Sequence, residues 1–359
     1  MPPDSSPERR YSSARARLVA DLPVSSFACV MATGIISIAA ALLGVARIAA
    51  ILLAVNALAF VLLWVLTLLR GIYCGSTLTA DLGDHRRGPG ALTVVAGTNV
   101  LGEQVALLTS HQDIAVILWV LGLALWIGLV YYLFAAFVTR EAKPSLSAAL
   151  DGSWLLIVVA PESSAILGAQ ISRGFSSPEP VIFINLSLCL LGGVFYFAII
   201  TLILYRWLFA AMAPSAFTPS YWINMGAAAI TALAGTRLSA AVVSYPSLAS
   251  TGGYLLGMTL LFWSVASWWI PLLAALMVWR HVIGRLRLVY QFDYWSLVFP
   301  LGMYAAATLS LAREIDAEFL AVVARFFFLA AAGAWCLTAF GMVRHLVDFG
   351  VVRQKRRRA

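Results

Sequence analysis

Four ionisable residues lie within long apolar segments, where a charge is costly unless it has a partner, water or a function. Glu103 and Arg237 fall in the segments 90–109 and 222–245, and Glu162 is near the centre of 152–171. A buried arginine offers a fixed positive charge with a planar fork that suits a carboxylate. A buried glutamate can take up and release a proton near neutral pH. These residue types predict a site that binds an anion and moves a proton with it.

The sequence leaves a second interpretation open for Glu162 and Arg237, in which they only neutralise each other. They are on different segments, and their depths differ by about 6 Å at 1.5 Å per residue. An ion pair is therefore as compatible with the spacing as a role in a permeation path. Arg325, in the segment 319–345, is expected to be structural and to reach toward the interface.

The chain lacks the patterns that an enzyme or a metal centre would need. It has no HExxH, P-loop or GxSxG motif, and the two serines that follow Glu162 have no histidine or lysine nearby in the segment to activate them. All four histidines fall in loops or at the ends of apolar segments: His85, His111, His281 and His345. We therefore expect no catalytic residues, no metal ligands and no cofactor.

Composition places the chain in a membrane. Of its 359 residues 62% are hydrophobic and 11% charged, with a mean hydropathy of +0.91, whereas soluble domains carry about 25% charged residues. A span needs roughly 20 apolar residues. The sequence predicts an all-α integral membrane protein with ten transmembrane helices, at approximately 24–44, 48–70, 90–109, 114–138, 152–171, 181–209, 222–245, 254–279, 292–311 and 319–345.

The positive charges give the predicted helices an orientation. Of the 24 Lys and Arg residues, two (Arg237 and Arg325) lie at membrane depth and three (Arg47, Arg173 and Arg313) in one set of connections. The other 19 lie in the alternate set of connections, at the span ends next to them, and in the termini. Because basic residues are retained in the cytoplasm, we expect both termini there, in the inner membrane of the cell. The net charge of +8 therefore favours a lipid bilayer and not a nucleic acid. The predicted parts are a cytoplasmic segment 1–23, a transporter domain 24–345 and a basic tail 346–359.

Short connections suggest that the ten helices form five hairpins. Helix-breaking Gly and Pro residues occur in the first helix of every hairpin, several of them near mid-span. Such breaks are tolerated where protein or a water-filled cavity satisfies the backbone, so the odd helices are predicted to surround a central pore. The alternative is that these glycines only allow close packing. Candidate lining residues on the odd helices are Thr33, Gly34, Thr98, Asn99, Gly235 and Pro300, together with Glu103, Glu162 and Arg237.

Four stretches resemble one known family. They are FACVMATGIISIAA from Phe27, GTNVLGEQ from Gly97, YWINMGAAAITALAGTRL from Tyr221 and YWSLVFPLGMYAAAT from Tyr294. In these the chain resembles the tellurite-resistance/dicarboxylate transporter family, which includes TehA, fungal malic acid permeases and plant slow-type anion channels. The resemblance implies ten helices in five hairpins around a pore, and a homotrimer with one pore per subunit. It also implies that Phe299, in the W-x-x-x-F context that begins at Trp295, is a pore gate.

The resemblance implies transport of small anions. Channel-like members have a largely apolar pore, whereas this chain carries Glu162 and Arg237 on pore-side helices. That departure favours a C4-dicarboxylate or malate-type carrier, with proton coupling. The alternatives are a gated passive channel for chloride or nitrate, and an exporter related to tellurite or sulfite.

Overall fold

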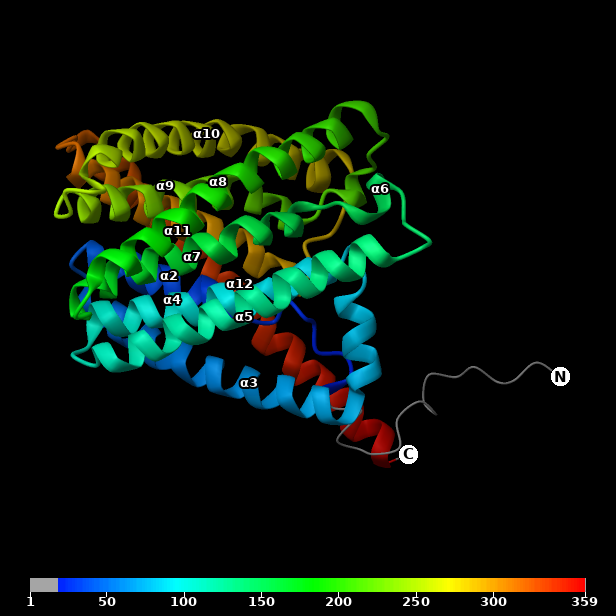
Figure 1. Cartoon of the computed structure of the whole chain (residues 1–359). Coiled ribbons are helices and arrows are strands. Elements are labelled where there is room, and N and C mark those ends of the chain that lie inside the picture. The colour runs from blue at the N-terminus through cyan, green and yellow to red at the C-terminus, as the bar shows by residue number, and fades with distance from the viewer. Residues whose placement is uncertain (1–18, 359) are drawn as a thin grey trace.

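A computed structural model describes residues 19–358, so the expected cytoplasmic segment is described only from Val19 onward. The described residues are helical and contain no strand (Figure 1). The α-helices are α2 (Ala28–Leu42), α3 (Ala46–Leu82), α4 (Thr93–Leu108), α5 (Gln112–Thr139), α6 (Leu146–Ala149), α7 (Leu156–Ile171), α8 (Pro178–Phe209), α9 (Ile223–Val242), α10 (Gly252–Val278), α11 (Trp295–Glu314) and α12 (Phe319–Arg358).

Nine helical segments within residues 19–358 are long and apolar enough to cross a bilayer. They coincide with the second to the tenth predicted spans, including 152–171, which forms a helix despite Pro161 and Glu162. The first predicted span is represented by α2, which has only 15 residues. At 1.5 Å per residue α2 is about 22 Å long, shorter than the roughly 30 Å of hydrocarbon that a span must cross.

The helices form two layers that differ in burial. In the apolar spans that contain α4, α7, α9 and α11, 72–94% of residues are buried inside the protein, and α2 is buried along most of its length. The corresponding values for the spans of α3, α5, α8, α10 and α12 are 22–50%. The outer helices also expose large apolar side chains, such as Leu58, Phe326 and Leu337. This outward apolar surface is the one a lipid bilayer would cover.

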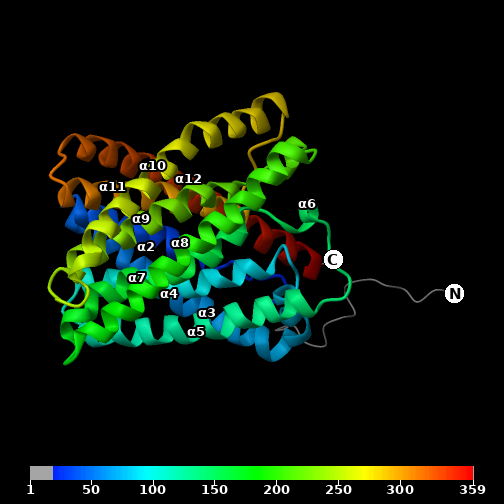
Figure 2. The same ribbon diagram turned by 45° about the horizontal axis from the view of Figure 1, so that its top comes forward.

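The five inner helices form a closed ring. In the order α2, α4, α7, α9 and α11, each helix packs against the next, and α11 packs against α2. Each inner helix also packs against the outer helix that follows it in the chain. Figures 1 and 2 show the resulting single bundle, with the long helices side by side and the short α6 at one end.

The inner helices begin at the same end of the bundle, and four of them begin with a 3₁₀ turn. These turns are Gly88–Leu92 before α4, Gly152–Leu155 before α7, Pro219–Trp222 before α9 and Phe292–Tyr294 before α11. We call this the amino end of the ring, and the opposite side the carboxy end. The alignment concentrates five helix amino termini around one axis.

Two helix boundaries differ from those expected. The loop predicted at 71–89 is shorter, because α3 continues to Leu82 through a kink at Cys74 (φ −137°, ψ 35°), where the ion pair between Arg70 and Asp81 bridges the two parts. At the other end of the chain, α12 continues to Arg358. The predicted division at residue 345 is therefore not a break in the helix.

Candidate functional site

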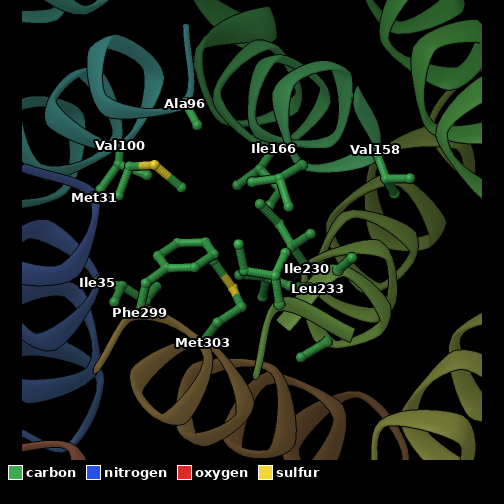
Figure 3. Close-up of a cluster of buried hydrophobic side chains, with 14 of the residues drawn as sticks. Met31, Ile35, Ala96, Val100, Val158, Ile166, Ile230, Leu233, Phe299 and Met303 are labelled. Carbon is green, nitrogen blue, oxygen red and sulfur yellow. The ribbon is translucent and has the colours of Figure 1, made fainter. Parts of the chain in front are cut away.

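Phe299 lies at the centre of the ring. Its side chain is 2% exposed, and it projects from α11 into a cluster of apolar side chains. Figure 3 shows the inner helices around its aromatic ring, with apolar residues converging from all of them. The other labelled members of this cluster are Met31 and Ile35 of α2, Ala96 and Val100 of α4, Val158 and Ile166 of α7, Ile230 and Leu233 of α9, and Met303 of α11. The centre of the ring is thus filled by an apolar constriction, which we call the Phe299 cluster.

The residues that flank Phe299 explain its direction. A Cβ atom on Gly226 of α9 would lie 2.7 Å from Cγ of Pro300, so α9 and α11 approach closely on that side. A Cβ atom on Gly302 would lie 2.8 Å from Ile35 Cγ2, so α11 and α2 approach closely on the other. At 100° per residue, position 299 falls between these two contact faces of α11. Phe299 is therefore directed inward by the two contacts beside it.

Arg237 of α9 and Glu103 of α4 form an ion pair across the ring. Arg237 Nη2 lies 3.9 Å from Glu103 Oε1, and their side chains are 31% and 4% exposed. Because α4 and α9 are not neighbours in the ring, the pair crosses the space that the ring encloses. Glu103 is three residues beyond Val100 and Arg237 four beyond Leu233. The pair therefore lies roughly 5–6 Å from the Phe299 cluster, on the carboxy side.

The ion pair leaves buried polar atoms without hydrogen bonds. Its 3.9 Å separation is longer than a hydrogen bond, and neither Glu103 Oε1 nor Arg237 Nε has a hydrogen-bond partner. Buried polar groups are normally satisfied, so such atoms indicate a place for water or a ligand. Arg237 thus retains donors for a further partner.

Glu162 does not pair with Arg237. Its side chain is fully buried between α7, α8 and α9, and neither carboxylate oxygen has a hydrogen-bond partner of ordinary geometry. Its polar neighbours are the Cys189 thiol of α8 and the Thr231 hydroxyl of α9. Gly192 of α8 provides the room, since a Cβ atom there would lie 2.8 Å from Glu162 Cδ. The ion pair that the spacing allowed is thus not formed, because Arg237 pairs with Glu103.

Three of the other predicted lining residues contact neighbouring helices. The Thr33 hydroxyl accepts a hydrogen bond from Trp335 Nε1 of α12 (2.9 Å). Gly34 lies close to Asn56 on α3, since a Cβ atom added to Gly34 would lie 3.0 Å from the amide nitrogen of Asn56. Gly235 lies against Thr259 of α10.

Two further predicted lining residues lie on α4. The Thr98 hydroxyl donates to its own helix, at the carbonyl of Val94 (2.7 Å). The Asn99 amide donates to the hydroxyls of Ser163 (3.1 Å) and Ser164 (2.8 Å) on α7. Of the predicted lining residues, Arg237 and Glu103 are the ones that the structure brings together across the ring, close to the predicted gate Phe299.

A vestibule opens at the amino end of the ring. It is a cavity of about 590 Å³, and the start of every inner helix contributes to its wall, at Ser25, Gly90, Ser153, Ser220 and Ser296. Helix amino termini carry partial positive charge and unpaired N–H groups, which favour anions. The sequence did not single out these residues, because serines at the edge of an apolar span look like ordinary loop residues.

The charged groups of the vestibule are largely paired with one another. Asp81 pairs with both Arg70 and Arg87, and Arg86 Nε lies 3.8 Å from Asp151 Oδ2. Burial raises the pKa of the Asp151 carboxyl above its usual value, although hydrogen bonds from Ser153 and the charge of Arg86 act in the opposite direction. Asp21 and Asp293 also line the vestibule, so its wall holds four carboxylates and three arginines. Since all three arginines are engaged, the positive groups left to an anion there are the helix termini.

The fold and the site define a multi-pass membrane protein whose inner helices enclose the Phe299 cluster and, beside it, the ion pair between Glu103 and Arg237. The chain matches the family model of the SLAC1 family, described as voltage-dependent anion channels, over residues 21–343. It therefore belongs to this family of anion channels and transporters, and the expected resemblance is confirmed.

Individual relatives agree with the family assignment. The chain is 35% identical over 151 residues to an uncharacterized membrane protein of Mycobacterium tuberculosis. The aligned residues are 42% of this chain and 76% of the relative. It is 26% identical over 253 residues to an uncharacterized transporter of Methanocaldococcus jannaschii, covering 68% and 70% of the two chains. A second uncharacterized transporter of that organism is 26% identical over 225 residues, or 60% of each chain.

Proposed function

We propose that this protein is a C4-dicarboxylate carrier of the malate type, in which the anion moves along the axis of the inner ring. The observation that carries this function is Arg237, which lies within the ring one helical turn from the Phe299 cluster. A guanidinium can bind one carboxylate of the anion through two parallel hydrogen bonds. Phe299 acts as the gate, because its ring occupies the centre of the path.

We also propose how the protein lies in the membrane. Ten crossings in five hairpins would place the amino end of the ring, with its vestibule, in the cytoplasm of a cell with an inner membrane. The distribution of Lys and Arg supports this orientation, since Arg47, Arg173 and Arg313 are the only basic loop residues on the other side. The ion pair would then lie in the outer half of the membrane, on the outer side of the gate. The homotrimer implied by the family resemblance, with one path per subunit, belongs to the same proposal.

A second candidate function is a gated passive channel for chloride or nitrate, or an exporter of related anions such as tellurite or sulfite. The Phe299 cluster favours it, because the labelled constriction contains only apolar side chains. An apolar constriction can close a path by excluding water and ions, and it needs no specific ligand for the anion. The two candidates therefore differ in whether Arg237 recognises a carboxylate or only attracts negative charge.

The test is flux into liposomes that contain the purified protein. Radiolabelled malate uptake and chloride current are compared with and without an inward proton gradient. Saturable malate uptake that the gradient increases supports the carrier. Chloride current that is independent of the gradient, without malate uptake, would replace the carrier with the passive channel.

A further inference from the structure

The ion pair between Glu103 and Arg237 occupies the axial path. It joins α4 and α9, which are separated in the ring by α7 on one side and by α2 and α11 on the other. An anion that moves along the axis must therefore pass between these two side chains or displace one of them. Arg237 attracts the anion, whereas the ionised carboxylate of Glu103 repels it at the same place.

The geometry of the pair makes Glu103 a replaceable partner. Its carboxylate is held at 3.9 Å, without a direct hydrogen bond, and its Oε1 atom has no other partner. A carboxylate bound directly to the guanidinium would form shorter, charge-assisted hydrogen bonds. Arg237 Nε, which has no partner, would complete the fork. Binding of an anion would therefore improve the bonding of Arg237 and leave Glu103 without its counter-ion.

Among the described residues, no second cation pairs with Glu103. Within residues 19–358, Arg237 is the charged group that acts on Glu103. Glu162 of α7 lies between α7, α8 and α9 and pairs with neither. The basic residues in the connections at the carboxy end, Arg47, Arg173 and Arg313, lie in loops or at helix ends, and none of them forms an ion pair with Glu103.

We infer that Glu103 is an internal carboxylate that competes with the transported anion for Arg237, and that it binds a proton when the anion takes its place. The proton comes from water at the carboxy end and adds to the Glu103 carboxylate, while the carboxylate of the anion binds the Arg237 guanidinium. The carboxylate that binds Arg237 replaces the charge of Glu103, so the guanidinium keeps one counter-charge, and the second carboxylate of a dianion adds one negative charge to the path. This inference rests on the proposed anion transport, and it makes Glu103 the proton-binding residue of that path.

The main test compares malate uptake into liposomes at external pH 7.5 and 6.5, where malate is mainly the dianion. The wild-type protein should gain up to about tenfold per pH unit, the slope for one linked proton. Glu103→Gln keeps the size of the side chain but cannot ionise, so its uptake should be nearly the same at both pH values. Asp113→Asn, which removes an exposed acid from the start of α5 at the same end, should keep the wild-type pH dependence.

A second measurement uses only the wild-type protein and is independent of how well a variant folds. Malate is added to purified protein in weak buffer at pH 7, and a pH dye reports the protons bound. Uptake of about one proton per bound malate is expected by linkage, and binding without proton uptake would overturn the inference. So would a Glu103→Gln protein that folds and keeps the full pH dependence, although anion transport would then stand. Absence of malate uptake in the wild type would instead remove the proposed function itself.

Discussion

Glu162 of α7 occupies the space that a side chain at Gly192 of α8 would fill, with its Cδ atom 2.8 Å from the Cβ position of that glycine. The same arrangement recurs between other neighbouring helices, where a buried polar side chain lies directly against a glycine. Asn99 lies against Gly122, and Asn185 against Gly168. Small residues and polar side chains are the usual means by which helices associate in lipid. The inner and outer layers are thus joined by matched pairs of this kind.

Gly192→Ala should destabilise the protein, because the new methyl group would overlap a fully buried carboxylate that has no room to move. Overpacking of this kind costs about 1–3 kcal/mol, measured as a lower thermal midpoint in detergent. Gly193→Ala is the matched control, since its Cβ would meet Phe262 Cζ at 3.5 Å, an ordinary contact. Equal midpoints for the two variants would contradict the placement of Glu162.

Phe299→Ala should increase anion flux per folded protein, because it removes the aromatic ring that fills the axis. Phe262→Ala is the matched control. Phe262 of α10 is equally buried, but it packs against Tyr196 of α8 at 5.4 Å between ring centroids, outside the inner ring. Both variants should lose about 3–5 kcal/mol of stability, while only Phe299→Ala raises the flux. A comparable flux increase in both would indicate general leakiness and would exclude the gate.

Arg237→Gln should weaken malate binding, since it removes the positive charge that lies one helical turn from the Phe299 cluster. A hydrogen bond to a charged group contributes about 1.5–3 kcal/mol, which corresponds to roughly a ten- to hundredfold increase in the malate concentration for half-maximal uptake. Arg47→Gln is the control, because Arg47 is exposed at the same end of the bundle. If Arg237→Gln lowered the yield of folded protein as much as the uptake, Arg237 would have a structural role only.

The free energy of unfolding should fall on mild acidification, because His85 binds a proton less readily in the folded protein than in the unfolded chain. His85 lies outside the membrane-spanning helices. Its ring stacks on Phe137 at 4.4 Å, and burial, followed by the charge of Arg140, lowers the pKa of His85 below 6.5. Asp84 acts in the opposite direction, and Lys143 adds to the effect of Arg140. A group whose pKa is lower in the folded state stabilises the fold above its unfolded pKa. That contribution is lost as the pH falls below about 6.5 toward the folded pKa.

His85→Phe keeps the stacking but cannot take up a proton, so its thermal midpoint should fall less between pH 7.5 and 5.5 than that of the wild type. The exposed His111, at the other end of the bundle, provides the control variant His111→Gln. Parallel curves for His85→Phe and the wild type would show that His85 does not contribute to the pH dependence.

The sequence was sufficient to determine the class of the protein and the position of most of its helices. In lipid, the backbone polar groups of a spanning segment must form their hydrogen bonds within that segment. An apolar run of sufficient length therefore predicts a helix wherever it occurs in the chain. Even 152–171 forms a helix, because Pro161 and Glu162 are both enclosed by protein. The family resemblance singled out Phe299 through the W-x-x-x-F context, and the structure places it at the centre of the ring, while its role as a gate stays a prediction. The local residues alone would not have distinguished it from any other buried aromatic residue.

Only the tertiary structure decided which of these residues meet. The depth of a residue in the membrane follows from its position along the helix, and by depth alone Arg237 was compatible with an ion pair to Glu162. The direction of a side chain depends on the rotation of its helix, at 100° per residue, and on which helices are neighbours in the ring. Packing turns Glu162 toward Gly192 and brings Glu103 across the ring to Arg237. It also gathers five helix amino termini into one vestibule. These relationships depend on contacts between segments far apart in the chain, which no local pattern of residues encodes.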